Sequence, residues 1–437
     1  MKALPLSTLL FAFLTLVPSA NANDDEDRTF LVGDFAIRPR LSVRLRDELR
    51  ENLTLNQNAN WDRDRERLLL RLDVAADLRW KWLEFSAGLT DGRELIHEVS
   101  SATSELDIAT LYIGLNNPAD IPLRVRIGRQ NWEFGSKRLI SISSWSNQKR
   151  AWDGLSVGAD FSKASVAAFA GNLVISEPGK LDRGDWDETL WGAQLQAAIN
   201  SDIHIDVYVY GLYKTARADS ANPIRGEDGG IGDENRVTPG VRIYGKHDSP
   251  KLAWELEAAF QVGKKATDEI HAFAIAADIS WAMPVPRAPE IGFSFNYASG
   301  DPDPEDSLAQ TFVPLYGTTH SPFGIADLFR WQNMFEAAPR FQVALHSKLK
   351  LRLEQHTFWL AETADAWVNS SGKILRQGQS SASNYAGQEW SIIAVWRPLE
   401  FVTVEGGFSK FIPGTFMRDT GDVKSASLGY LSAAFQY

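Results

Sequence analysis

The sequence predicts an all-β protein, a transmembrane antiparallel β-barrel of about 18 strands. Three observations predict it. Polar and apolar residues alternate along most of the chain. The N-terminal segment has the features of a secretory signal peptide. After that segment, the rest of the 437-residue chain contains no apolar run of the length that a transmembrane helix needs.

Residues 1–22 are predicted to be a cleaved signal peptide. Lys2 supplies the basic start, residues 9–17 form the apolar stretch, and Ala20-Asn21-Ala22 has the small-x-small pattern of a cleavage site. A retained N-terminal anchor is the alternative, but the apolar stretch is too short to span a bilayer. Residues 23–437 are then expected to form a single outer-membrane barrel domain.

The composition excludes several classes of function. Lys and Arg number 45 against 56 Asp and Glu, a net charge of −11, which argues against a nucleic-acid partner. The chain has no Cys, so disulfides, thiolate metal sites and cysteine nucleophiles are excluded. Its seven His are scattered, and it carries no H-E-x-x-H, G-x-S-x-G or Walker A pattern. We therefore predict no catalytic residues, no enzyme activity, no cofactor and no metal.

The first two predicted strands show the alternation most clearly. In residues 38–46, the even-numbered positions, which we call one parity, hold Arg38, Arg40, Arg44 and Arg46. The odd-numbered positions, the other parity, hold Leu41, Val43 and Leu45. Residues 63–80 repeat this pattern, with Arg, Asp and Leu69 on one parity and only apolar residues from 68 to 80 on the other. Successive side chains of a strand point to opposite faces, so each segment has a cationic face and an apolar face.

Later segments continue the pattern at the length of barrel strands, about 10 residues each. The parity switches within residues 106–113, which predicts a β-bulge or a misplaced strand start. The other alternating segments are residues 83–89, 123–128, 191–197, 203–210, 254–261, 291–297, 349–356 and 431–437.

The predicted connections fall into two classes, as expected for short periplasmic turns and long extracellular loops. Several Trp residues fall near strand ends, which is typical of interfacial aromatic girdles. A soluble β-sandwich is the alternative, but it would need a second apolar layer that these charged faces do not offer. The short turns are predicted at 80–81, 117–120, 200–201, 248–250, 284–289, 347–348 and 398–399, and the long loops at 173–188, 215–235, 300–330 and 362–385.

Arg residues dominate the polar parity, which indicates a lumen suited to anions. Arg binds carboxylates through a planar fork, and rings of Arg or Lys are a usual device of anion pores. The alternative is that these side chains brace the wall in ion pairs with Asp73, Asp77, Glu84 or Glu255. The lumen candidates are Arg38, Arg40, Arg44, Arg46, Arg65, Arg67, Arg71, Arg79, Arg124, Arg126, Arg129 and Arg352.

Three stretches resemble the alginate export family of outer-membrane proteins. The first is residues 126–130 (RIGRQ), followed by Arg138-Leu139-Ile140 and residues 150–154 (RAWDG). Trp152 stands where that family more usually has Phe. The second runs from Ser299-Gly300-Asp301 through TFVPLY at 311–316 to Asp327, and the third joins Gln332-Asn333 to residues 356–361. The resemblance implies an 18-stranded barrel that exports an anionic exopolysaccharide through a basic pore, and it supports Arg129 and Arg138 as lumen residues.

We therefore expect an outer-membrane channel of a Gram-negative bacterium that exports alginate or a related polyuronate. The alternatives are a general or anion-selective uptake porin, an outer-membrane hydrolase, and an adhesive barrel. The expected partners are an anionic polysaccharide or small anions, outer-membrane lipid and periplasmic polymer-secretion proteins.

The segments 300–330 and 362–385 are candidates for a gate. The acidic residues 301–306 suit a solvated loop better than a Ca²⁺ site, since they lack the EF-hand pattern.

Overall fold

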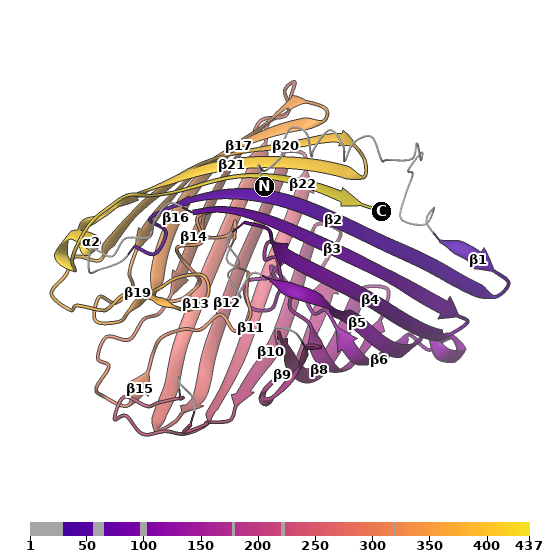
Figure 1. Cartoon of the computed structure of the whole chain (residues 1–437), viewed down its shortest axis with the longest axis horizontal. Coiled ribbons are helices and arrows are strands. Elements are labelled where there is room, and N and C mark those ends of the chain that lie inside the picture. The colour runs from indigo at the N-terminus through magenta and orange to yellow at the C-terminus, as the bar shows by residue number, and fades with distance from the viewer. Residues whose placement is uncertain (1–28, 56–64, 97–102, 177–179, 220–222, 319) are drawn as a thin grey trace.

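The computed structural model describes residues 29–55, 65–96, 103–176, 180–219, 223–318 and 320–437, and the predicted signal peptide lies outside them. Within these residues, eighteen antiparallel strands form a closed barrel (Figure 1). The last strand pairs with the first, with Ser42 opposite Gln436 and Glu51 opposite Ser427. Closure leaves the sheet no free edge, which is the condition for a sheet to cross a lipid bilayer.

The barrel strands are β2 (Phe35–Glu51), β3 (Arg65–Trp80), β4 (Leu83–Glu94), β5 (Ser104–Asn116), β6 (Leu123–Gln130), β7 (Trp152–Asp160), β8 (Ala164–Ile175), β9 (Arg183–Ala198), β10 (Ile203–Lys214), β11 (Glu234–Asp248), β12 (Lys251–Lys265), β13 (Asp268–Ala282), β14 (Glu290–Ala298), β16 (Met334–His346), β17 (Leu349–Trp359), β20 (Tyr385–Leu399), β21 (Val402–Pro413) and β22 (Ala426–Gln436). The short elements are β1 (Phe30–Val32), η2 (Pro118–Asp120), β15 (Leu308–Ala309), β18 (Trp367–Val368), β19 (Ile374–Arg376) and α2 (Thr415–Asp419).

The predicted alternation is confirmed in the strands. In β3, Arg71 is 6% exposed, whereas its neighbour Leu72 is 38% exposed and Val74 is 46% exposed. Apolar side chains thus point outward, where lipid covers them, and polar ones point into the lumen. The predicted bulge is also confirmed, because Gly88 pairs with Thr110 and Leu89 pairs with Ile108, which leaves one extra residue in β5.

The connections fall at two ends of the barrel, as predicted. The short turns gather at one end, and the predicted turn at 398–399 lies slightly later, at 400–401. The predicted long loop at 173–188 is wrong in extent, because β8 and β9 leave only residues 176–182 between them. A long connection at 131–151 was not predicted, although this stretch contains two Asn, one Gly and five Ser.

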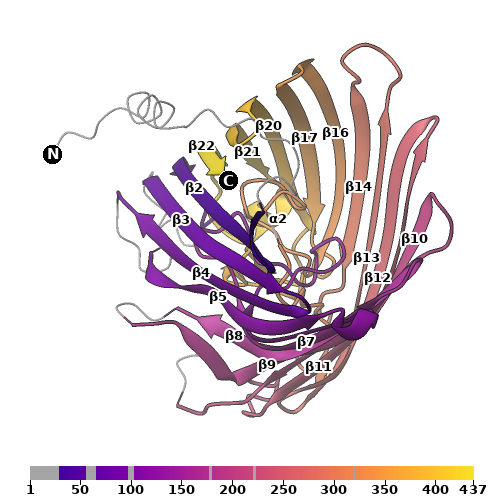
Figure 2. The same cartoon turned by 90° about the vertical axis from the view of Figure 1, so that its right-hand side faces the viewer.

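Three long connections fold back into the lumen (Figure 2). We name residues 131–151 inner loop A, 299–333 inner loop B and 360–384 inner loop C. Loops A and B pair through their backbones, because Tyr316 N–H donates to Leu139 O at 2.8 Å and Ser141 N–H donates to Tyr316 O at 3.1 Å. Loop C joins them through the Trp367 indole N–H, which donates to Leu328 O at 3.0 Å.

Apolar side chains give these inner loops a core of their own. Ile140, Phe312 and Trp331 are fully buried, and all three belong to one cluster with wall residues such as Phe358. The Phe329 ring stacks on the Phe358 ring of β17 at 3.8 Å between centroids. The lumen is therefore filled by a packed plug, rather than left as an open water channel.

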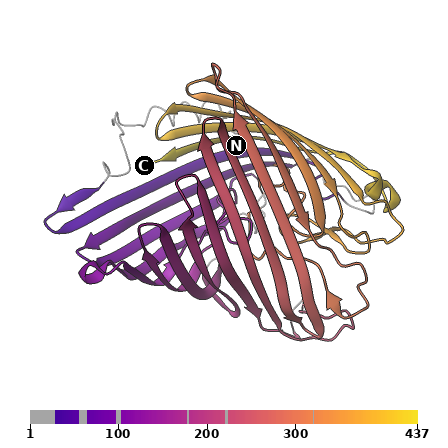
Figure 3. The ribbon, with the colours of Figure 1, turned by 180° about the vertical axis from the view of Figure 1, so that it is seen from behind.

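The wall is uneven in height. Strands β6 and β7 have 8 and 9 residues, whereas β11, β12 and β13 have 15 each. Figure 3 shows the long strands from behind. Within the described residues, no helix has the length and apolar character needed to span a bilayer.

Candidate functional site: the arginines and cavities of the lumen

The predicted arginines of β2 and β3 face the lumen, and those nearer the loop end hold inner loop A. Arg44 and Arg71 both donate to Ser144 O, at 3.0 and 2.9 Å, and Arg46 donates to Trp145 O at 2.7 Å. Arg40 lies nearer the short turns and forms an ion pair with Asp77 at 2.9 Å. The arginines on the lumen face therefore fall into two groups. Arg44, Arg46 and Arg71 bind inner loop A, whereas Arg40 is exposed to the open part of the lumen.

The remaining candidates of these two strands lie toward the rims. Arg67 forms a two-pronged ion pair with Glu94, with both contacts at 3.0 Å. Arg65 is exposed at the loop end of β3, and Arg79 is exposed at its short-turn end. Arg38 is half-buried in β2. The ion pair with Glu94 gives Arg67 a bracing role in the wall, which is the alternative that the sequence left open.

Arg124, Arg126 and Arg352 also face the lumen, and each has an acidic partner. Arg126 contacts Glu84 at 2.8 Å, Arg124 contacts Asp160 at 3.0 Å and Arg352 contacts Glu354 at 3.1 Å. The Arg126 and Arg124 side chains remain 34% and 40% exposed, so they can still meet a ligand in the lumen.

The two arginines that the family resemblance supported are placed differently from the others. Arg129 lies on the parity of the exposed Ile127, opposite to Arg126, and pairs with Asp153 at 2.7 Å. It therefore does not belong to the lumen row. Arg138 lies in inner loop A, where it is buried and pairs with Glu255 and Glu257 of β12. It fastens the loop to the far wall.

Three cavities follow one another from the short-turn half of the lumen to the loop end. The first cavity, of about 410 Å³, is lined by Arg40, Arg124 and Arg126 together with Tyr112 and Trp132. Such a combination of guanidinium groups and aromatic rings suits an acidic sugar, since the rings offer apolar faces and the cations bind carboxylates.

The second and third cavities extend this series. The second, of about 300 Å³, shares Arg40 and Asn131 with the first and is also lined by Lys149. The third, of about 560 Å³, shares Arg150 and Leu173 with the second. Because neighbouring cavities share wall residues, they lie next to one another, and each is lined by at least one basic side chain.

The third cavity contains two cations that the sequence prediction missed. Burial lowers the pKa of Arg150 to about 10, and burial together with the neighbouring Arg150 and Arg236 lowers the pKa of Arg330 to about 10. Both guanidinium groups therefore stay charged at neutral pH. Arg150 donates to backbone carbonyls, including Tyr316 O at 2.6 Å. Among the described residues, neither Arg150 nor Arg330 has a carboxylate as an ion-pair partner.

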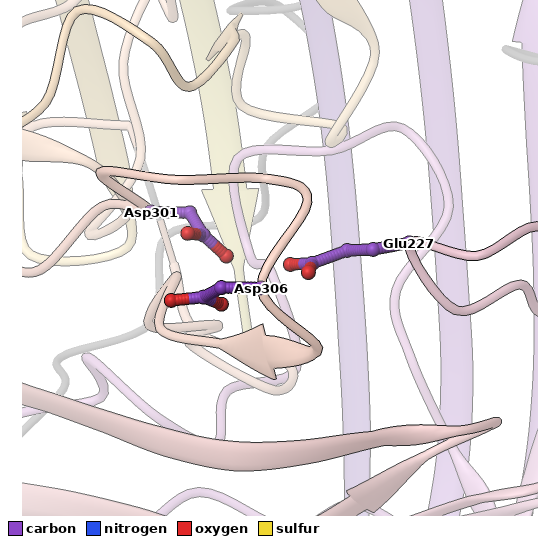
Figure 4. A group of neighbouring side chains, drawn as sticks. All are labelled: Glu227, Asp301 and Asp306. Carbon is purple, nitrogen blue, oxygen red and sulfur yellow. The ribbon is translucent and has the colours of Figure 1, made fainter.

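An acidic group borders the third cavity. Carboxylate oxygens of Glu227, Asp301 and Asp306 lie within 4.8 Å of one another and approach from two different loops (Figure 4). Burial and the nearby Asp301 raise the pKa of Glu227. Asp301 and Asp306 belong to the acidic stretch noted in the sequence, and Glu227 could not be associated with them without the fold. If each carboxylate bound through one oxygen, the three would supply three of the 6–8 oxygens that Ca²⁺ takes.

Comparison with solved structures supports the barrel. The chain is similar to the Pseudomonas aeruginosa outer membrane protein OpdK, with a TM-score of 0.63, 8% identity and coverage of 92% of this chain and 98% of that chain. It is also similar to OccK8 (OprE) of the same organism, with a TM-score of 0.60, 10% identity and coverage of 92% and 98%. Identities this low show the fold alone. Comparison with curated proteins gives no match.

The family comparison covers nearly the whole chain. The family model described as alginate export matches residues 37–430, which include all eighteen barrel strands in whole or in part. A barrel of this kind places the protein in the outer membrane of a Gram-negative bacterium. The chain belongs to the alginate export family of outer-membrane β-barrel proteins.

Proposed function

We propose that this barrel exports an anionic exopolysaccharide, alginate or a related polyuronate, along the three cavities beside the plug. The observation that carries the proposal is the pair of guanidinium groups in the third cavity, Arg150 and Arg330, that have no acidic partner among the described residues. An uncompensated charge removed from water is costly, so these groups favour an anion beside them.

Several basic stages in series suit a polymer. A uronate chain carries one carboxylate on each sugar, so it can occupy Arg40, Lys149 and Arg150 at the same time and move stepwise between them. Conduction requires binding that is favourable enough for entry but weak and repeated enough for exit. The acidic partners of Arg40 and Arg126 weaken their hold on a substrate and thereby serve this requirement.

An uptake porin for small anions is the second candidate. The same arginines favour it, and the two functions differ in the substrate that occupies the path. A polyuronate that enters only one mouth and blocks the current supports the exporter. Passage of small organic anions without block by the polymer supports the porin.

Removal of Arg150 and Arg330, which have no carboxylate partner in the described ranges, tests the path. We expect the purified protein in a planar bilayer to be anion-selective under a KCl gradient, and the double substitution Arg150→Gln with Arg330→Gln to move the reversal potential toward that of an unselective pore. The matched control is Arg217→Gln with Arg225→Gln, which removes the same charge from two exposed loop residues that line none of the three cavities. Equal shifts in both double variants would contradict the assigned path.

A further inference from the structure

The tip of inner loop A, residues 143–147, is held to the wall by guanidinium groups that bind its backbone. Arg44 donates to Ser144 O at 3.0 Å and to Ser146 O at 3.1 Å. Arg71 donates to the same two carbonyl oxygens at 2.9 and 2.7 Å. The Arg46 guanidinium lies over the Trp145 ring at 3.7 Å. Three cations of β2 and β3 thus converge on one short stretch of loop.

The acceptors in this contact are neutral carbonyl groups. Among the described residues, Arg44 has no carboxylate ion-pair partner, and the nearest acidic contact of Arg71 is Asp73 at 3.3 Å. A carboxylate adds an opposite charge to the hydrogen bond and can accept from both prongs of one guanidinium, whereas each loop carbonyl is neutral and offers a single oxygen. A carboxylate that reaches Arg44 or Arg71 therefore competes favourably with the loop carbonyls.

The proposed path leads to this contact. Ser146, whose carbonyl oxygen accepts from both Arg44 and Arg71, lines the second cavity, as does Lys149. Arg40, on the same parity of β2 as Arg44, lines both the first and the second cavity. A carboxylate that moves from Arg40 into the second cavity thus arrives beside the loop tip.

The tip also contacts inner loop B and the barrel wall. The Trp145 ring stacks on His320 of inner loop B at 3.6 Å between centroids. The Asn147 amide donates to Leu70 O at 3.2 Å and to Arg93 O at 3.3 Å. Among the described residues, the tip forms no strand pairing with the wall, so side chains determine its position. The Trp145 ring also lies edge-on to the Tyr430 ring of β22 at 4.9 Å, a contact that is lost when the tip leaves.

We propose that the tip of inner loop A is a gate released by the substrate itself: uronate carboxylates take over the guanidinium groups of Arg44 and Arg71 and free the loop. This inference rests on the proposed function, because it needs an acidic saccharide in the second cavity. The same cations thereby close the lumen when the carbonyl groups occupy them and bind substrate when the loop has left.

The absence of Cys from the chain permits a direct test. The Asn147→Cys variant carries its only thiol at a position that is 5% exposed with the tip in place. It also loses the amide bonds to Leu70 O and Arg93 O, so its labelling rate without saccharide is the reference for every comparison. We expect a polar thiol reagent to label it slowly in lipid vesicles. A short oligouronate should raise the labelling rate at least about tenfold, the scale of losing one charge-assisted hydrogen bond. A neutral oligosaccharide of equal length should leave it unchanged, and Ser201→Cys in an exposed short turn is the labelling control.

Two further variants separate the gate from the path. Arg44→Gln in the Asn147→Cys background should label fast without any oligouronate, and Arg44→Lys, which keeps the charge but loses the fork, should lie between the two. The inference is overturned if the oligouronate blocks the channel current and the labelling rate stays the same, since the path is then used without release of the tip. If the oligouronate changes neither current nor labelling, the proposed function fails together with the gate.

Discussion

The Gly317→Ala variant should conduct several times more current than the unmodified barrel, because it separates inner loops A and B. A Cβ atom at Gly317 would lie 1.9 Å from the backbone oxygen of Arg138, a distance at which one of the two loops must move. The backbone bonds between Tyr316 and residues 139 and 141 would break with that movement. Single-channel conductance in planar bilayers measures the result.

A matched alanine substitution serves as the control for Gly317→Ala. At Gly406 in β21, an added Cβ would have its nearest heavy atoms at 3.7 Å, an ordinary contact distance. Gly406→Ala should therefore keep the original conductance. If both variants conduct as the unmodified barrel does, the inner loops do not limit the current, and the plug is not the barrier that its packing indicates.

The second large effect is expected at Arg138, which fastens inner loop A to β12. Arg138 is buried and contacts both Glu255 and Glu257, the latter at 3.2 Å. Arg242 also pairs with Glu255, at 2.5 Å, so Glu257 is the carboxylate that loses its cation in Arg138→Met. Breaking a buried pair on one side leaves an uncompensated charge, and we expect a loss of about 3–5 kcal/mol in the free energy of unfolding.

Urea unfolding in detergent micelles, followed by circular dichroism, measures that loss. The double variant Arg138→Met with Glu257→Gln removes the orphaned charge as well and should recover a large part of the stability. An unchanged unfolding midpoint in Arg138→Met would show that the ion pair is not formed in the folded protein. Equal losses in the single and double variants would assign the effect to packing rather than to charge.

The sequence predicted the wall well because a membrane barrel imposes one rule on every strand. Each side chain points either to lipid or to the lumen, so parity alone placed Arg44, Arg71 and Arg126 inside. Arg129 is instructive, since its parity already matched the apolar Ile127. The family resemblance predicts a lumen position for Arg129, whereas the structure follows the parity.

The plug was not predictable from periodicity. Inner loops A, B and C have no regular alternation, and their direction depends on contacts between residues far apart in the chain, such as Arg44 with Ser144 and Gln261 with Val313. Loops B and C were expected as candidates for a gate, whereas loop A was not expected at all. Its inward position also explains why several predicted lumen arginines are engaged by the protein itself.

The cations of the third cavity were missed for a related reason. Arg150 stands in a motif that the family resemblance quoted, and Arg330 follows another, but neither lies on an alternating strand. Only the fold shows that Arg150, Arg236 and Arg330 meet in one cavity. Within the part of the chain that the structure describes, Arg236 alone of the three has an acidic partner, Glu234 at 2.8 Å. Charge balance within a cavity is a property of the folded chain.

Current block by polymer tests the export path most directly. Purified barrels in a planar bilayer would receive a polyuronate on one side at a time, with a neutral polysaccharide of the same length as reference. We predict reversible block by the polyuronate from the short-turn side, with weaker block in Arg150→Gln with Arg330→Gln, and no block by the neutral polymer. Equal block by both polymers, or none by the polyuronate, would contradict an arginine-guided path for an anionic polysaccharide.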